Sequence, residues 1–235
     1  MTLIPAFVSY EFADRKELCL SVAAQSNRSV LLVPPLFDEM NRMRKMLVDV
    51  MRALHALEIS SFLPDLPGTN ESLTALDRVT LSDWQKAIRA CAEQHKISHI
   101  ASFRGGALIV AEMQSADHWI FSPVKGATIL RTMLRTKVAA DREAGMITSL
   151  AELAAEAEAG PLELAGNIIG SGLFTQLNSA EIPELKNQRI VRLESDNKPA
   201  DFQIPGSALW LRAEPDDDPA MSSAIALDIA GWIGT

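Results

Sequence analysis

The stretch Ile97-Ser98-His99-Ile100-Ala101-Ser102-Phe103-Arg104-Gly105-Gly106-Ala107-Leu108 decides the fold of this chain. Its first half, Ile97 to Ser102, is a short apolar run, which predicts a buried strand. The two adjacent glycines predict a tight turn, and the residues from Gly105 to about Gln114 predict a helix. The stretch therefore indicates a strand that turns sharply into a helix.

The segments on either side continue this alternation of strand and helix. Short apolar runs that end at prolines or polar turns predict buried strands, and the stretches between them have the apolar spacing of helices. The predicted strands are 6–12, 17–24, 30–33, 60–63, 97–102, 118–121, 189–193 and 208–212. The predicted helices are 38–57, 81–95, 105–114, 126–144, 150–159 and 218–233. This order predicts an α/β fold with a mostly parallel sheet of about eight strands and helices on both faces.

The chain has 235 residues, which is enough for one domain with its own core. It has neither an internal repeat nor a low-complexity linker, so residues 1–235 are predicted to form a single domain. Residues 125–187 lie between two predicted sheet strands, and their last part, 161–185, has no regular pattern. We expect part of this segment to form a small cap.

A strand, a sharp turn and a helix in this order carry the nucleophile of the α/β-hydrolase fold, in the pattern small-x-Ser-x-Gly. Two alignments of that pattern fit here. With Gly106 as the second glycine, Arg104 stands at the tip and Ser102 is the first small residue. With Gly105 as the second glycine, Phe103 stands at the tip. Neither alignment places a Ser, Cys or Asp nucleophile at the tip.

The general base is missing from its expected position as well. In this fold the base is a histidine in the loop before the last helix, and residues 212–218 contain none. All four histidines come earlier in the chain, at His55, His95, His99 and His118. The sequence therefore predicts no working Ser-His-Asp triad and names no firm catalytic residue, with Ser102 as the alternative nucleophile. It also predicts neither a metal site nor a cofactor.

Several motifs resemble one family. The segment Val33-Pro34-Pro35-Leu36-Phe37-Asp38-Glu39-Met40-Asn41 resembles the V-P-P-F-x-E-E-M-N segment of the exosortase A system-associated hydrolase 2 family, which has the α/β-hydrolase fold. Pro64-Asp65-Leu66-Pro67-Gly68 resembles the end of that family's next strand. Residues 102–108 resemble its G-L-R-L-G-A-L turn, where Arg replaces Ser, although this chain has Ser102 where Gly is usual.

The resemblance covers about residues 30–145 and favours Arg104 as the residue at the tip. It implies an α/β-hydrolase fold and a link to exopolysaccharide and exosortase systems of some Gram-negative bacteria.

Arg104 is the central candidate for a binding site. The carboxyl ends of parallel strands border the crevice where open α/β sheets bind ligands, and a buried guanidinium needs an acidic neighbour or an anion. We therefore expect either a closed ion pair with Asp38, Glu39 or Asp65, or a clamp for a carboxylate, sulfate or phosphate group. The predicted ligand-binding residues are Leu36, Phe37, Glu39, Asp65, Phe103, Arg104 and Gly105.

Two functions remain open at this point. One is a non-catalytic accessory or ligand-binding protein that keeps a hydrolase pocket. The other is an active hydrolase or acyltransferase, similar to an esterase or thioesterase, that acts on a small acyl or glycan-linked substrate.

Composition excludes some other functions. The net charge of −8 argues against a nucleic-acid partner. Two cysteines without metal-ligand spacing predict free thiols in a reducing compartment. The first ten residues lack the pattern of a signal peptide, and no apolar run is long enough to span a membrane. We therefore expect a cytoplasmic protein that binds a small molecule, and we leave its oligomeric state open, a homodimer included.

Overall fold

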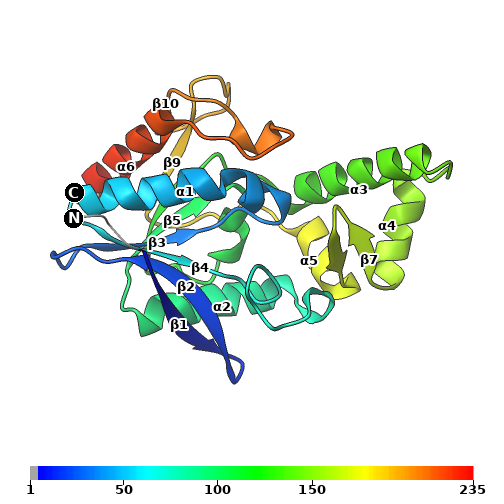
Figure 1. The fold of residues 1–235 in the computed structure, drawn as a ribbon, viewed down its shortest axis with the longest axis horizontal. Coiled ribbons are helices and arrows are strands. Elements are labelled where there is room, and N and C mark those ends of the chain that lie inside the picture. The colour runs from blue at the N-terminus through cyan, green and yellow to red at the C-terminus, as the bar shows by residue number, and fades with distance from the viewer. Residues whose placement is uncertain (1–4, 235) are drawn as a thin grey trace.

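The computed structural model describes residues 5–234, which form an eight-stranded sheet with helices on both faces (Figure 1). The strand order is β1-β2-β4-β3-β5-β6-β9-β10. β1 and β2 form an antiparallel hairpin at one edge, and β2 runs antiparallel to β4. The other strands are parallel to one another. Their bounds are β1 Ala6–Phe12, β2 Arg15–Val22, β3 Ser29–Val33, β4 Ser60–Pro64, β5 His99–Phe103, β6 Asp117–Phe121, β9 Gln188–Leu193 and β10 Phe202–Ile204.

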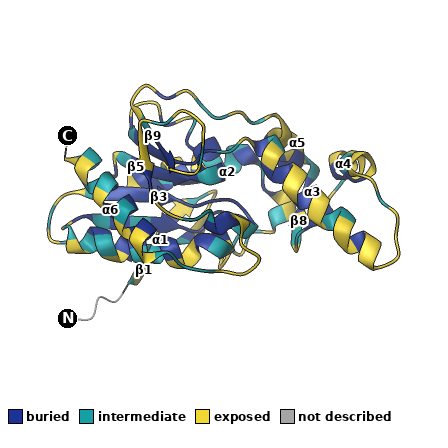
Figure 2. Ribbon diagram, turned by 90° about the horizontal axis from the view of Figure 1, so that it is seen from above, coloured by how far each residue is buried: buried dark blue, intermediate teal, exposed yellow. Residues whose placement is uncertain are grey.

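Two cores flank the sheet. α1 (Asp38–Ala56) and α6 (Pro219–Ile233) pack on one face, and α2 (Leu81–Gln94) packs on the other with the short 3-10 helix η2 (Arg104–Ile109). The central strands are buried on both faces, as their continuous apolar runs predict (Figure 2). Thr80 caps the start of α2, and its side chain accepts from the backbone N–H of Asp83 in a capping box.

A second group of elements projects beyond the carboxyl ends of the strands (Figure 1). We call it the α3–α5 lobe. It contains α3 (Gly126–Glu143), α4 (Leu150–Ala159), β7 (Leu162–Leu164), β8 (Asn167–Ile169) and α5 (Ser171–Ser179). Its buried residues belong to the same apolar core as those of α2. The lobe is therefore packed firmly on the body of the molecule.

Two glycines fix this packing. A Cβ on Gly126 would lie 2.0 Å from the carbonyl oxygen of Leu177 in α5. A Cβ on Gly170 would lie 2.0 Å from the carbonyl oxygen of Asp77, in the 3-10 turn η1 (Leu76–Arg78). No side chain fits at either position, so the backbones approach closely there.

Three sequence predictions are corrected by the structure. The helix expected from Gly105 to about Gln114 is only the 3-10 helix η2, because this segment is buried on all sides and has no solvent face. The strand expected at 208–212 is instead the 3-10 helix η3 (Leu209–Leu211), and the last strand is β10. Leu209 and Trp210 are apolar because they pack in the core beside α1.

The third correction concerns 161–185, most of which forms regular elements up to Ser179. β7 and β8 pair through a two-residue turn at Ala165 and Gly166, which have φ of 49° and 74°. This is the turn geometry that tight hairpins require. α5 follows directly. Within residues 5–234, no helix is both long and apolar enough to cross a membrane.

Candidate functional site

Arg104 occupies the tip of the turn after β5. Its φ is 54°, in the left-handed region that non-glycine residues rarely adopt. Two other residues with positive φ follow the neighbouring strands: Phe37 after β3, with φ of 54°, and Ser122 after β6, with φ of 43°. Such strained residues gather at functional sites in known proteins. The three together mark this edge of the sheet.

The sequence around Arg104 forces the sharp turn. A Cβ on Gly106 would lie 2.5 Å from the carbonyl oxygen of Pro34 and 2.7 Å from that of Val33. The chain therefore passes directly against the end of β3, which only glycine permits. The Arg104 side chain is left at the carboxyl edge of the sheet.

The guanidinium of Arg104 is held on three sides. Its Nε donates to Oε2 of Glu39 at 3.1 Å, and its Nη2 donates to Oε1 of the same carboxylate at 2.9 Å. Nη1 donates to the carbonyl oxygen of Ser122 at 2.9 Å. The indole of Trp210 stacks on the guanidinium, with 4.2 Å between Cζ and the ring centroid. This is a bidentate ion pair with a fixed orientation.

The ion pair forms the floor of a cavity of about 280 Å³ between the sheet edge and α3. Apolar side chains dominate its walls, and three threonines of α3 stand four residues apart along one wall. The lining residues are Leu36, Phe37, Asp38, Glu39, Arg42, Arg104, Val124, Thr128, Ile129, Thr132, Met133, Thr136, Trp210 and Leu211.

The charges of the floor balance. Nη2 of Arg42 lies 3.8 Å from Oδ2 of Asp38, and Nη1 of Arg42 donates to the carbonyl oxygen of Trp210 at 3.0 Å. Two arginines thus face two carboxylates. Three of the five N–H groups of Arg104 are used by Glu39 and Ser122. Two donors remain for a further acceptor.

The structure separates the predicted ligand-binding residues into two groups. Leu36, Phe37, Glu39 and Arg104 line the cavity, whereas Asp65, Phe103 and Gly105 do not. The ring of Phe103 lies in the core, 5.6 Å from that of Trp119. Gly105 is buried, and a Cβ there would lie 2.7 Å from Cδ1 of Ile129.

Asp65 does not join the ion pair. Its carboxylate accepts from the side-chain amide of Asn70 at 2.7 Å, and burial raises its pKa. Of the three acidic residues that the sequence offers as ion-pair partners of Arg104, the structure selects Glu39. Glu39 is one of the two acidic residues that open α1, where the positive end of the helix dipole favours carboxylates.

The sequence interpretation missed Trp210 and the threonine-bearing face of α3. The sequence predicts a strand at 208–212, whereas the 3-10 helix η3 forms there and brings the ring of Trp210 over Arg104. Thr128, Thr132 and Thr136 share one face of α3 because residues four apart in a helix are neighbours. That spacing in the sequence could have identified the polar wall.

The histidines lie away from the cavity. His99 and His118 stand at the start of β5 and β6, so they lie at the opposite ends of the strands from Arg104. Burial lowers the pKa of His118, whose Nε2 lies 2.9 Å from the carbonyl oxygen of Met113. His55 contacts the carbonyl oxygen of Ala23, and His95 stacks on Phe62. None of them is among the residues that line the cavity.

Ser102, the alternative nucleophile, lies inside β5 with no exposed surface. Its hydroxyl has no hydrogen-bond partner among the described residues and does not line the cavity. A hydroxyl in this position has no path to a substrate.

Comparison with known proteins places this geometry on a known fold. No family model and no curated protein matches the chain. Est1E from Butyrivibrio proteoclasticus, solved with ferulic acid bound, is similar with a TM-score of 0.67 at 12% identity, over 96% of this chain and 97% of that one. A predicted CIB-like hydrolase from Thermoplasma acidophilum is similar with a TM-score of 0.52 at 10% identity, over 100% of both chains.

The chain has the α/β-hydrolase fold. The bottromycin epimerase BotH, in complex with bottromycin A2, is similar as well, with a TM-score of 0.59 at 13% identity, over 97% of this chain and 99% of that one. At these identities the likeness concerns the fold alone. An esterase, an epimerase and a predicted hydrolase thus share the α/β-hydrolase fold with this chain, and the resemblance to the exosortase-associated family stays a prediction.

Proposed function

We propose that this chain is a small-molecule-binding protein on an α/β-hydrolase scaffold, without acyl-hydrolase chemistry. The observation that carries the proposal is the guanidinium at the tip of the turn after β5, tied to Glu39 and to Ser122. A guanidinium stays protonated in proteins and is not a nucleophile. A triad also needs a base within hydrogen-bond reach of the nucleophile, and the histidines lie elsewhere.

The chemistry of the cavity defines the ligand class. Trp210, Ile129 and Met133 offer an apolar wall, and the two unused N–H groups of Arg104 offer donors at the floor. The floor is already neutral, so a ligand with several negative charges would be repelled by Glu39 and Asp38. We propose a small, mainly apolar ligand with one carboxylate or singly charged phosphate group.

The cellular setting is proposed from the resemblance alone. The motifs in residues 33–41 and 102–108 support a role beside exopolysaccharide or exosortase systems. We propose the cytoplasm as its location. The cavity supports the same general picture, in which the protein holds a small molecule without converting it.

A binding titration tests the proposal. Ferulate is the probe, because it is an aromatic carboxylate of suitable size and is bound in the similar Est1E structure. We expect quenching of tryptophan fluorescence on binding, and its loss in Trp210→Phe. Glu39→Gln leaves Arg104 without its counter-charge and should tighten ferulate binding about tenfold.

The double variant Arg104→Met/Glu39→Met removes both charges and should abolish ferulate binding. Its matched control is Lys45→Met/Asp49→Met, which removes a partly exposed ion pair of α1 that does not line the cavity. Unchanged affinity in Glu39→Gln and in the double cavity variant would refute the proposal.

A further inference from the structure

Three arginines form an exposed row along α3. Arg131, Arg135 and Arg142 follow one another at spacings of four and seven residues, which are close to one and two turns of a helix, so they share one stripe. All three are exposed, and none of their side chains makes a hydrogen bond or ion pair with another described residue. By contrast, Lys137 lies on another side of α3 and pairs with Asp141 at 2.5 Å. The row is a basic stripe without ion pairs in a chain of net charge −8.

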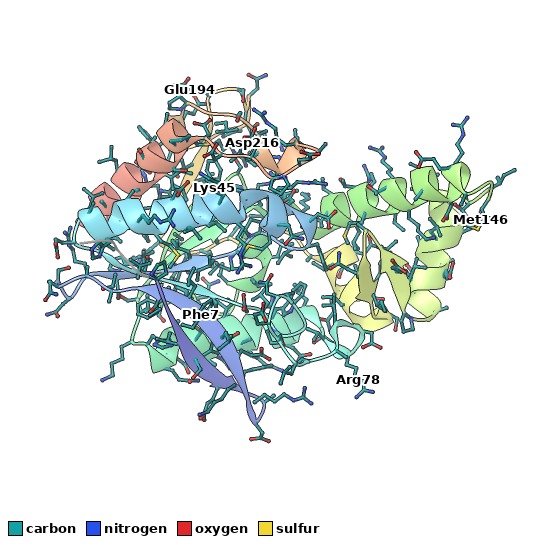
Figure 3. The ribbon with its side chains drawn as sticks, viewed as in Figure 1. Phe7, Lys45, Arg78, Met146, Glu194 and Asp216 are labelled. Atoms are coloured by element: carbon teal, nitrogen blue, oxygen red, sulfur yellow. The ribbon has the colours of Figure 1, made fainter. Side chains whose placement is uncertain are left out.

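The stripe ends at an apolar tip. Met146, Ile147 and Leu150 follow α3 at the far end of the lobe and have 50%, 101% and 39% of their surface exposed. Figure 3 shows Met146 at this outer end, far from the body of the molecule. Large apolar side chains exposed together in this way mark interaction sites.

We propose that this edge of the lobe docks on an anionic lipid bilayer. The arginines would lie along the headgroups, where each basic side chain attracts the negatively charged surface. The protruding tip would enter the interfacial region, as the apolar faces of interfacial segments do. A bilayer fits because the apolar residues protrude at an end of the lobe and need a soft surface that accepts them. Val138 and Ala139, between the arginines, add small apolar surface.

Nearby acidic residues set the orientation of docking. Glu143 borders the stripe, and Glu152, Glu156 and Glu158 are exposed on α4. With a net charge of −8, most of the remaining surface is repelled by anionic lipid. Binding is therefore expected only with the arginine stripe toward the bilayer, and it decreases with salt because the attraction is screened.

Vesicle sedimentation tests the proposal. The full chain should sediment with phosphatidylcholine vesicles that contain phosphatidylglycerol and not with pure phosphatidylcholine vesicles. The triple variant Arg131→Gln/Arg135→Gln/Arg142→Gln should weaken binding by about fivefold for each arginine. Met146→Ser/Ile147→Ser should weaken it as well, with circular dichroism confirming that each variant folds.

A matched control comes from the loop before α2, outside α3 and the apolar tip. Leu73 is 96% exposed and Arg78, labelled in Figure 3, is exposed without an ion pair in the described residues. The variant Leu73→Ser/Arg78→Gln removes the same residue types and should leave vesicle binding unchanged. Equal loss in this control, equal binding of the triple variant, or absence of vesicle binding would overturn the proposal.

Two further readouts identify the partner. Cys19 and Cys91 are fully buried, so Ile147→Cys can be labelled selectively with a polarity-sensitive dye. The dye should report an apolar environment on anionic vesicles, whereas the same dye at Leu73→Cys should not. Retention of the protein on dextran sulfate without any vesicle binding would contradict the bilayer and favour an acidic macromolecule. The result does not depend on what the cavity binds.

Discussion

The two ends of strands β5 and β6 differ in backbone, charge and access. At the carboxyl ends, Arg104 and Ser122 have left-handed backbones and border a cavity with a neutralised ionic floor. At the amino ends, His99 and His118 lie within regular strands. His99 packs against the ring of Trp232, and His118 contacts the carbonyl oxygen of Met113. A hydrolase needs the activated residue and the imidazole at the same end. Here the imidazoles lie at the amino ends of these two strands, and the strained tip lies at their carboxyl ends.

The largest effect on this comparison is expected from Gly106→Ala. A Cβ would lie within 2.5–2.7 Å of two backbone carbonyl oxygens, which cannot move without displacing the end of β3. We expect a loss of about 3 kcal/mol in the free energy of unfolding, measured by urea denaturation. Gly160→Ala is the control, because nothing lies within 4 Å of its Cβ position. Equal losses in both variants would show that the strained edge is not special.

The next effect concerns the ion pair. Arg104→Met leaves the carboxylate of Glu39 half-buried and without its partner, which should destabilise the fold by about 2–3 kcal/mol. The double variant Arg104→Met/Glu39→Met should recover most of that loss, because no unpaired charge remains. A double variant no more stable than Arg104→Met would contradict the view that the pair closes the floor.

The stability of the fold should depend on pH through His118, at the amino end of β6. Burial lowers the pKa of His118 from its ordinary value of 6.5, so the folded state binds fewer protons than the unfolded state. Stability should therefore decrease as the pH falls below about 6.5, until the folded-state pKa is passed. The raised pKa of Asp65 acts in the opposite direction, so the difference between the chain and His118→Leu is the useful quantity. This difference should change with pH below about 6.5 and become constant above pH 7; a difference independent of pH over the whole range would refute the account.

The smallest effect is expected at the polar wall. The hydroxyl of Thr132 donates to the carbonyl oxygen of Thr128 in the same helix, an interaction that contributes little to stability. Thr132→Val should change the free energy of unfolding by less than about 0.5 kcal/mol and should tighten ferulate binding about twofold by enlarging the apolar wall. Calorimetric titration measures the second quantity. Weaker binding would show that this hydroxyl contacts the ligand.

The sequence predicts the sheet and its flanking helices well, because continuous apolar runs and helical spacing are local signals. Val30 to Val33 and Thr80 with its capping box are examples. It fails where packing determines local structure. Leu209 and Trp210 have a strand-like composition but serve the core beside α1, and the buried segment after Arg104 has no periodicity.

The site was predictable in part for the same reason. Arg104 and Glu39 follow from the order of parallel strands, since both stand at carboxyl ends. The indole of Trp210 and the threonines of α3 come from segments distant from Arg104 in the chain. No local sequence pattern predicts that they lie beside it.

The most direct test of the central claim is intact-mass spectrometry after treatment with a fluorophosphonate, which reacts with activated serines. The account predicts no adduct on the native protein. A single stoichiometric adduct on native protein, mapped to Ser102 or Ser122 and absent after heat unfolding, would contradict it.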